Sequence, residues 1–162
     1  MRWELLDSFE FLKKHSHACA QKAYSGKEDF FLEHHPGRPL VPEPLFVEMI
    51  AQTGGVLYGL GLDFKKEVIL AKIIRAKFGA PVAPPCEFTI EARIREEREE
   101  GALILGVVRC GRTEVASAEI LLVAVQAGTL ADQKKIVFND HFMTHYKIEE
   151  VVERSTKSEV TR

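Results

Sequence analysis

The chain has 162 residues, of which 46% are hydrophobic and 28% are charged, and its formal net charge is −2. These values fit one globular domain with a real core. They exclude a strongly basic domain, so nucleic acid is not the expected partner. The longest uncharged run, from Met49 to Leu62, is too short and too rich in glycine to span a bilayer, so we expect no membrane association.

The N-terminal stretch MRWELLDSFEF contains early acids and no apolar core, so we expect no signal peptide. The three cysteines, Cys19, Cys86 and Cys110, are an odd number without paired spacing. Reduced thiols in a cytoplasmic protein are the expected state of such cysteines.

The N-terminal third contains no long helical pattern. Residues 1–8 are expected to form a short turn or helix, and residues 8–25 one strand or two. The segment 26–37, GKEDFFLEHHPG, is expected to be a short strand that ends in a turn. Prolines at 36, 39, 42 and 44 then exclude a regular helix before Pro44, which suits a first helical position because it lacks an N–H.

The segment from Leu45 to Leu60, LFVEMIAQTGGVLYGL, is apolar on nearly every side. Such a pattern is typical of a fully buried helix. Gly59 and Gly61 mark its expected end.

Beyond this helix the hydrophobic period changes to two. In the clearest case Phe88, Ile90, Ala92 and Ile94 share one face of a strand while charged residues share the other, as in an antiparallel sheet that is wet on one side. The expected strands are four, at residues 67–78, 86–99, 102–111 and 113–125.

One long buried helix followed by a strand meander predicts an α+β fold in which the sheet curls around the helix. We expect this domain to cover residues 1–125. Residues 126–162 are expected to be an appendage that is partly helical, with Asn139 as a helix cap and with Phe142, Tyr146 and Val152 on its inner side.

Glu48 is the only charged residue between Pro44 and Leu60. A buried carboxylate without a partner is costly, and burial raises the pKa of a carboxyl, which makes such a group a competent general acid. The alternative is that Glu48 faces a rim or pairs with a basic side chain at an interface.

His34 and His35 precede the proline-rich turn. A neutral histidine is a common general base, although two adjacent loop histidines are more often simply solvated. The prolines fix the path from His34 to the helix start, whose N–H groups suit a carbonyl that gains negative charge. A base, an acid and an oxyanion site together favour proton abstraction beside a carbonyl.

The stretch HHPGRPLVPEPLFVEMIAQ resembles the signature of the FabZ/FabA-type 3-hydroxyacyl-[acyl-carrier-protein] dehydratases. Their pattern runs G-H-F-P-G-x-P-x-M-P-G-x-L-x-x-E-x-x-A-Q. The positions that match in register are His34, Pro36, Gly37, Pro39, Pro42, Leu45, Glu48, Ala51 and Gln52. Residues 71–94 resemble a second family segment, and the resemblance covers roughly residues 5–125.

This resemblance implies a hotdog fold and a homodimer, or a higher assembly such as a trimer of dimers, with each active site shared between two chains. It implies that His34 removes the α-proton of a 3-hydroxyacyl thioester and that Glu48 of the other chain assists the loss of water. It implies substrate binding by Glu43, Pro44, Leu45 and Gln52, without a cofactor or metal. The glutamate at position 48 resembles the FabZ branch.

The chain departs from the family pattern at Glu33, His35, Glu43 and Pro44. Glu43 replaces a glycine beside the substrate carbonyl, and Pro44 lacks an N–H. The expected function is dehydration of a 3-hydroxyacyl thioester to the trans-2-enoyl thioester, in fatty-acid or related lipid or polyketide synthesis. The alternatives are a hotdog thioester hydrolase and a non-catalytic acyl-binding or assembly subunit with the same fold.

Two weaker patterns concern partners. Lys72, Arg75 and Lys77 could meet an acyl carrier protein, or simply form a solvated strand face. The histidine pairs at 15 and 17 and at 141 and 145 lack an evident third ligand, so solvated histidines are expected there in place of zinc.

Overall fold

The computed structural model describes residues 5–34, 36–126 and 137–160. Its strands form one antiparallel sheet in the order β1-β2-β4-β5-β6-β3. The strands are β1 (Ser8–Lys13), β2 (His17–Tyr24), β3 (Lys66–Phe78), β4 (Cys86–Glu97), β5 (Gly101–Cys110) and β6 (Thr113–Gln126). The helices are α1 (Phe30–His34), α2 (Glu43–Gly61), α3 (Asp140–His145) and α4 (Ile148–Val160).

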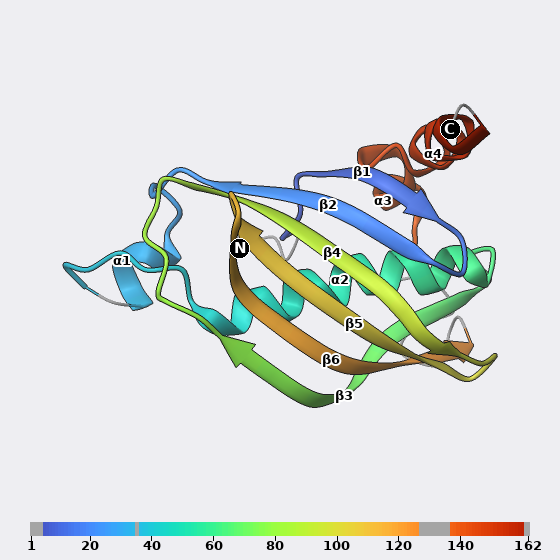
Figure 1. The fold of residues 1–162 in the computed structure, drawn as a ribbon, viewed down its shortest axis with the longest axis horizontal. Coiled ribbons are helices and arrows are strands. Elements are labelled where there is room, and N and C mark those ends of the chain that lie inside the picture. The colour runs from blue at the N-terminus through green and yellow to red at the C-terminus, as the bar shows by residue number, and fades with distance from the viewer. Residues whose placement is uncertain (1–4, 35, 127–136, 161–162) are drawn as a thin grey trace.

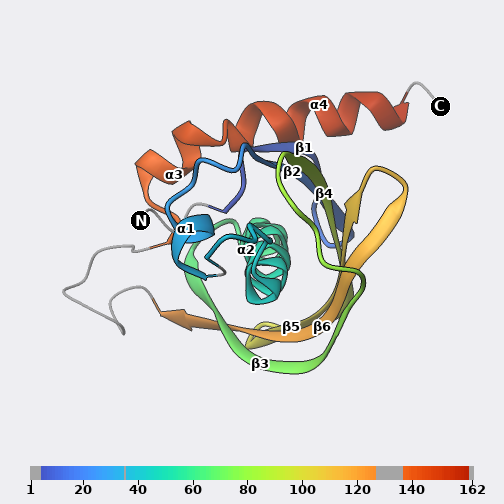
Figure 2. The same ribbon diagram turned by 90° about the vertical axis from the view of Figure 1, so that its left-hand side faces the viewer.

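Helix α2 lies inside the curve of this sheet (Figure 1). Figure 2 looks along α2 and shows the strands curving around it, with α4 outside the sheet beside β1. The prediction of a hotdog fold, an antiparallel sheet wrapped around one long helix, is confirmed. The helix begins at Glu43, one residue before Pro44, which was the predicted first helical position; Pro42 is the N-cap and Pro44 fits the first turn.

Small residues bring α2 close to the sheet. A Cβ atom placed on Gly54 of α2 would lie 2.8 Å from the Ile104 side chain of β5, and one on Gly106 of β5 would overlap the side chain of Ile50. The β4 side chains of Phe88 and Ile90 are fully buried on the same side of the sheet. The core therefore consists of a glycine-rich helix pressed against the inner face of the central strands.

The segment 26–37 is not the predicted strand, because it contains helix α1. Glu28 accepts hydrogen bonds from the N–H groups of Ser25 and Gly26, which turns the chain away from the sheet. The rings of Phe30 and Phe31 then pack edge-on against Tyr24, at 5.4 and 5.8 Å between centroids. Local turn bonds and aromatic packing thus outweigh the strand preference of this segment.

The C-terminal segment packs against β1 through α4. Ser155 accepts a hydrogen bond of 3.0 Å from the Leu12 N–H, and the Tyr146 hydroxyl donates one of 3.1 Å to the Leu6 carbonyl. Ile148 and Val151 are buried in this contact. Asn139 caps α3 as predicted, because its side chain accepts from the Phe142 N–H.

The division into a domain of residues 1–125 and an appendage stays a prediction. We expect a chain truncated after Val125 to keep the sheet and α2, because these contain most of the core, and to expose apolar surface around Phe9 and Leu12. Circular dichroism and binding of a hydrophobic dye measure both effects. If only aggregated chain is recovered, residues 126–162, the C-terminal tail, are required for the core to form.

We expect Gly106→Ala to lower the free energy of unfolding by about 1–3 kcal/mol, because the added methyl overlaps Ile50 in a close-packed core. The matched control is Gly55→Ala, whose Cβ would have only one neighbour, Val68, at 4.0 Å. Denaturant unfolding of both variants measures the difference. Equal stability of the two variants would contradict the close packing of α2 and β5.

Candidate active site

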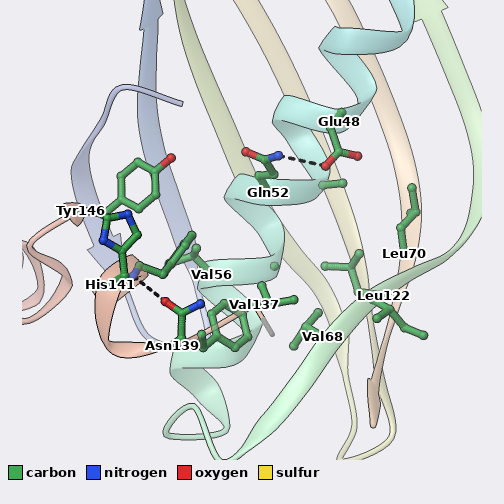
Figure 3. Close-up of a pocket in the computed structure, with 15 residues that line it drawn as sticks. Glu48, Gln52, Val56, Val68, Leu70, Leu122, Val137, Asn139, His141 and Tyr146 are labelled. Atoms are coloured by element: carbon green, nitrogen blue, oxygen red, sulfur yellow. Dashed lines mark hydrogen bonds between the residues drawn. The ribbon is translucent and has the colours of Figure 1, made fainter. Parts of the chain in front are cut away.

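A cavity of about 480 Å³ lies between α2, the strands β3 and β6, and the C-terminal segment. Figure 3 shows side chains from all of these elements converging on it. Its walls are formed by Glu48, Ala51, Gln52, Gly55, Val56, Val68, Ile69, Leu70, Leu122, Val137, Phe138, Asn139, His141, Phe142 and Tyr146. The lining is mostly apolar, with one carboxylate.

Glu48 is that carboxylate, and it is oriented by Gln52 one turn further along α2. The Gln52 side-chain N–H donates to Glu48 Oε1 at 3.0 Å, and the Gln52 Oε1 accepts from the Leu5 N–H at 3.1 Å. The two bonds together fix which way the amide points. Residues four apart lie on one helix face, so the local sequence E-x-x-x-Q places this pair together.

Glu48 is half-buried on the cavity wall, so in the single chain its position is nearer to the predicted alternative, a residue at a rim, than to a fully buried acid. The apolar neighbours of Glu48 on α2 are buried, but the carboxylate itself faces the cavity beside the helix. A carboxylate that faces a mostly apolar cavity and is held by an amide can exchange a proton with a bound molecule.

His34 ends helix α1 and is exposed, and it is not among the residues that line the Glu48 cavity. Figure 1 shows α1 beyond the N-terminal end of α2, outside the curve of the sheet. The described residues of one chain therefore do not bring the predicted base to the cavity that contains the predicted acid. The adjacent His35 lies outside the described residues.

Among the four predicted substrate-binding residues, only Gln52 lines the cavity. Glu43 and Pro44 are exposed in the first turn of α2, and Leu45 is half-buried there. The Leu45 N–H donates to the Pro42 carbonyl at 3.0 Å. Since proline has no N–H, the Glu43 N–H is the remaining backbone donor of this turn.

Strand β3 is an edge of the sheet and carries exposed apolar side chains. These are Leu70, Ile73, Ile74 and Phe78, which are between 37% and 49% exposed. Lys72, Arg75 and Lys77 lie on the same strand and are also exposed. An apolar edge strand with free backbone groups is a surface to which another strand can add.

The tail residues of the cavity wall were not predicted as site residues. The aromatic spacing at Phe142 and Tyr146 indicates an inner face, but nothing local indicates that this face meets α2. The contact depends on the Val137 N–H, which donates to Glu67 across 70 positions of sequence at 3.0 Å.

The thiols are poor candidates for nucleophiles. Burial raises the pKa of Cys19, and burial together with Cys110 raises the pKa of Cys86 to about 11. Both thiols therefore stay protonated near neutral pH.

Within residues 5–34, 36–126 and 137–160, His, Cys, Asp and Glu side chains form no group of three or more that could hold a metal ion. Over the same residues, no helix is long and apolar enough to cross a membrane.

Residues 11–119 match the model of a family described as ApeI-like, ApeI dehydratase. The chain belongs to this dehydratase family. The predicted resemblance to dehydratases and the prediction of a dehydratase enzyme are thereby confirmed. The match stops before the tail residues of the cavity wall.

Named relatives point the same way. A 3-hydroxyacyl-[acyl-carrier-protein] dehydratase FabZ of Caulobacter sp. (strain K31) is 30% identical over 129 residues, which are 78% of this chain and 79% of the relative. The structure of the dehydratase heterocomplex ApeI:P from Xenorhabdus doucetiae superimposes with a TM-score of 0.65 at 18% identity, covering 79% of this chain and 87% of that one.

The fold is also similar to that of a hypothetical thioesterase from Streptococcus pneumoniae TIGR4 solved with coenzyme A. The TM-score is 0.57 at 7% identity, covering 73% of this chain and 84% of that one. This likeness concerns the fold alone.

Replacing Gln52 tests whether it orients Glu48. We expect Gln52→Met to reduce kcat for the family reaction about ten- to a hundredfold, because a reacting group that loses its orienting contact is misplaced relative to the substrate. Gln52→Glu is the matched variant, since it keeps an acceptor for Leu5 and removes the donor to Glu48. Steady-state kinetics should show both variants impaired. Full activity of Gln52→Glu would show that Gln52 serves only to accept the hydrogen bond from the Leu5 N–H and does not orient Glu48.

Proposed function

We propose that the chain dehydrates a 3-hydroxyacyl thioester to the trans-2-enoyl thioester, with each active site built from two copies of the chain. The observation that carries this proposal is the Glu48 carboxylate, oriented by Gln52 on the wall of a mostly apolar cavity. The family membership supports the reaction type. The FabZ name of the relatives supports acyl carrier protein as the carrier of the substrate.

The second half of each site would come from the partner. His34 does not line the Glu48 cavity of its own chain, and β3 offers an apolar edge for a second copy. Pairing of two β3 edges would be isologous, so it would complete two equivalent sites at once. The partner's His34 would then face the cavity that contains Glu48.

In the proposed reaction the imidazole of the partner's His34 takes the proton from the carbon next to the thioester carbonyl. The electron pair of that C–H bond is first delocalised onto the thioester carbonyl as an enolate, and it then forms the C2–C3 double bond as the C3–O bond breaks. Glu48 gives its proton to the departing hydroxyl, which leaves as water. Transfer of the proton from the imidazolium back to the carboxylate restores both groups.

The thioester carbonyl gains negative charge as the α-proton leaves. We propose that the Glu43 N–H, at the positive end of α2, donates to this oxygen. The Glu43 side chain is exposed, so its carboxylate can point into solvent. Lys72, Arg75 and Lys77 are exposed on β3 of the single chain. Pairing of two β3 edges uses backbone groups, so we propose that these side chains stay available to the acidic carrier protein.

Thioester hydrolysis is the second candidate, because one fold can host both reactions and a hypothetical thioesterase shares this fold. A hydration assay with a short trans-2-enoyl thioester separates the candidates. Addition of water without release of thiol supports the dehydratase, and release of thiol supports the hydrolase. If neither occurs, the chain is a non-catalytic acyl-binding or assembly subunit.

We expect His34→Ala and Glu48→Gln each to reduce dehydration about a hundred- to ten-thousand-fold, because each removes one positioned acid–base group. Glu48→Gln keeps the side-chain shape, so a loss of activity in this variant reflects the loss of proton transfer and not a change in packing. The activity of both variants is measured in the hydration direction, as the rate at which the absorbance of the enoyl thioester falls.

The control is a mixture of the two inactive variants under subunit exchange. One of the two sites in a mixed dimer receives an intact His34 and an intact Glu48, so part of the activity should return. If exchange is confirmed by mass and no activity returns, the two residues do not act together across an interface.

A further inference from the structure

The cavity follows one face of α2 away from Glu48. Its wall on the helix passes from Glu48 to Gly55, and the next turn begins at Gly59. At 1.5 Å per residue, Gly59 lies roughly 16 Å along the axis from Glu48. A linear group that reacts beside Glu48 would therefore run along α2 towards its C-terminal end.

The two glycines on this path have different surroundings. A Cβ placed on Gly55 would have Val68 as its nearest neighbour, at 4.0 Å, so the helix is open to the cavity there. A Cβ placed on Gly59 would lie 2.7 and 2.8 Å from ring atoms of Phe138. The Phe138 ring therefore rests directly on the helix backbone and closes the path at Gly59.

Phe138 belongs to the C-terminal segment and is held there by several contacts. It is buried, and its ring packs edge-on against Phe64 at 5.1 Å. The preceding N–H, that of Val137, donates at 3.0 Å to the carboxylate of Glu67, which is itself 2% exposed. A buried carboxylate bonded to the backbone beside Phe138 fixes the position of the ring.

The apolar side chains that face the cavity near Phe138 can bind a hydrocarbon chain. Val68 and Leu122 form the opposite wall (Figure 3). Two of the polar tail residues use polar atoms within the fold, since Asn139 Oδ1 accepts from the Phe142 N–H and the Tyr146 hydroxyl donates to the Leu6 carbonyl. The His141 ring lies on the same wall and is the one histidine that the described tail residues add to the lining. An apolar chain loses fewest hydrogen bonds by entering this end of the cavity.

We infer that Phe138, resting on Gly59, is the end wall of an acyl pocket and limits the substrate to medium-length acyl chains. The inference rests on the proposed function for the identity of the group that enters. It assigns chain-length selection to a segment that lies outside the family match at residues 11–119. Shorter chains would end before Gly59, and longer chains would collide with the ring.

The test compares Phe138→Ala with Ile148→Ala. Both remove a large buried side chain from the C-terminal segment, but Ile148 does not line the cavity, so Ile148→Ala loosens the tail without removing the wall. Each protein is assayed with 3-hydroxyoctanoyl and 3-hydroxyhexadecanoyl thioesters. We expect Phe138→Ala to raise the long-to-short ratio of kcat/KM at least tenfold and Ile148→Ala to leave this ratio unchanged.

Binding of saturated fatty acids, measured by calorimetry, provides a readout that needs no chemistry. With the unaltered protein, affinity should rise about fourfold per added methylene up to medium length and then fall. With Phe138→Ala it should continue to rise to hexadecanoate. Gly55→Leu, which fills the open stretch, should weaken binding of octanoate and longer acids.

The outcomes separate the two proposals. If no thioester is dehydrated but the binding series changes as described, the proposed reaction fails and the acyl pocket stands. An unchanged length dependence in Phe138→Ala overturns the inference. So does an equal change in Ile148→Ala, which would attribute the effect to a loosened tail, and so does the absence of fatty-acid binding in every variant.

Discussion

Helix α2 can lie inside a curled sheet only because small residues let the helix and the strands approach closely. Gly54 faces Ile104, and Gly106 faces Ile50, so each glycine receives a branched side chain of the opposite element. This contact sets the depth at which α2 sits and therefore the space left on its other side. The cavity beside Glu48 occupies that space. Core packing and the candidate site are thus two consequences of the same close approach.

Much of the fold could be predicted from local pattern. The alternation around Phe88 and Ile90 identifies both a strand and its inner face, because side chains on a strand point to opposite sides in turn. The run from Leu45 to Leu60 identifies the central helix for a similar reason, since only an enclosed helix can be apolar on all sides. Helix α1 was missed because the hydrogen bonds that Glu28 accepts and the edge-on packing of Phe30 and Phe31 against Tyr24 leave no periodic signal.

The site was predictable only in part. The pairing of Glu48 with Gln52 follows from their spacing on a helix, and both residues were singled out. The sequence left open whether Glu48 is buried or lies at a rim, because the cavity beside it is formed by strands and a C-terminal segment far away in sequence. The same is true of Phe138, whose place on Gly59 depends on long-range contacts such as that of Val137 with Glu67. Periodicity carries no information about such contacts.

The central claim is that two chains share each site, since one chain places Glu48 in a cavity and leaves His34 outside it. The most direct measurement is specific activity over a dilution series that spans dissociation of the dimer, with the oligomeric state followed by sedimentation at the same concentrations. The shared-site account predicts that specific activity falls in proportion to the fraction of dimer. A monomer that retains full specific activity would contradict it.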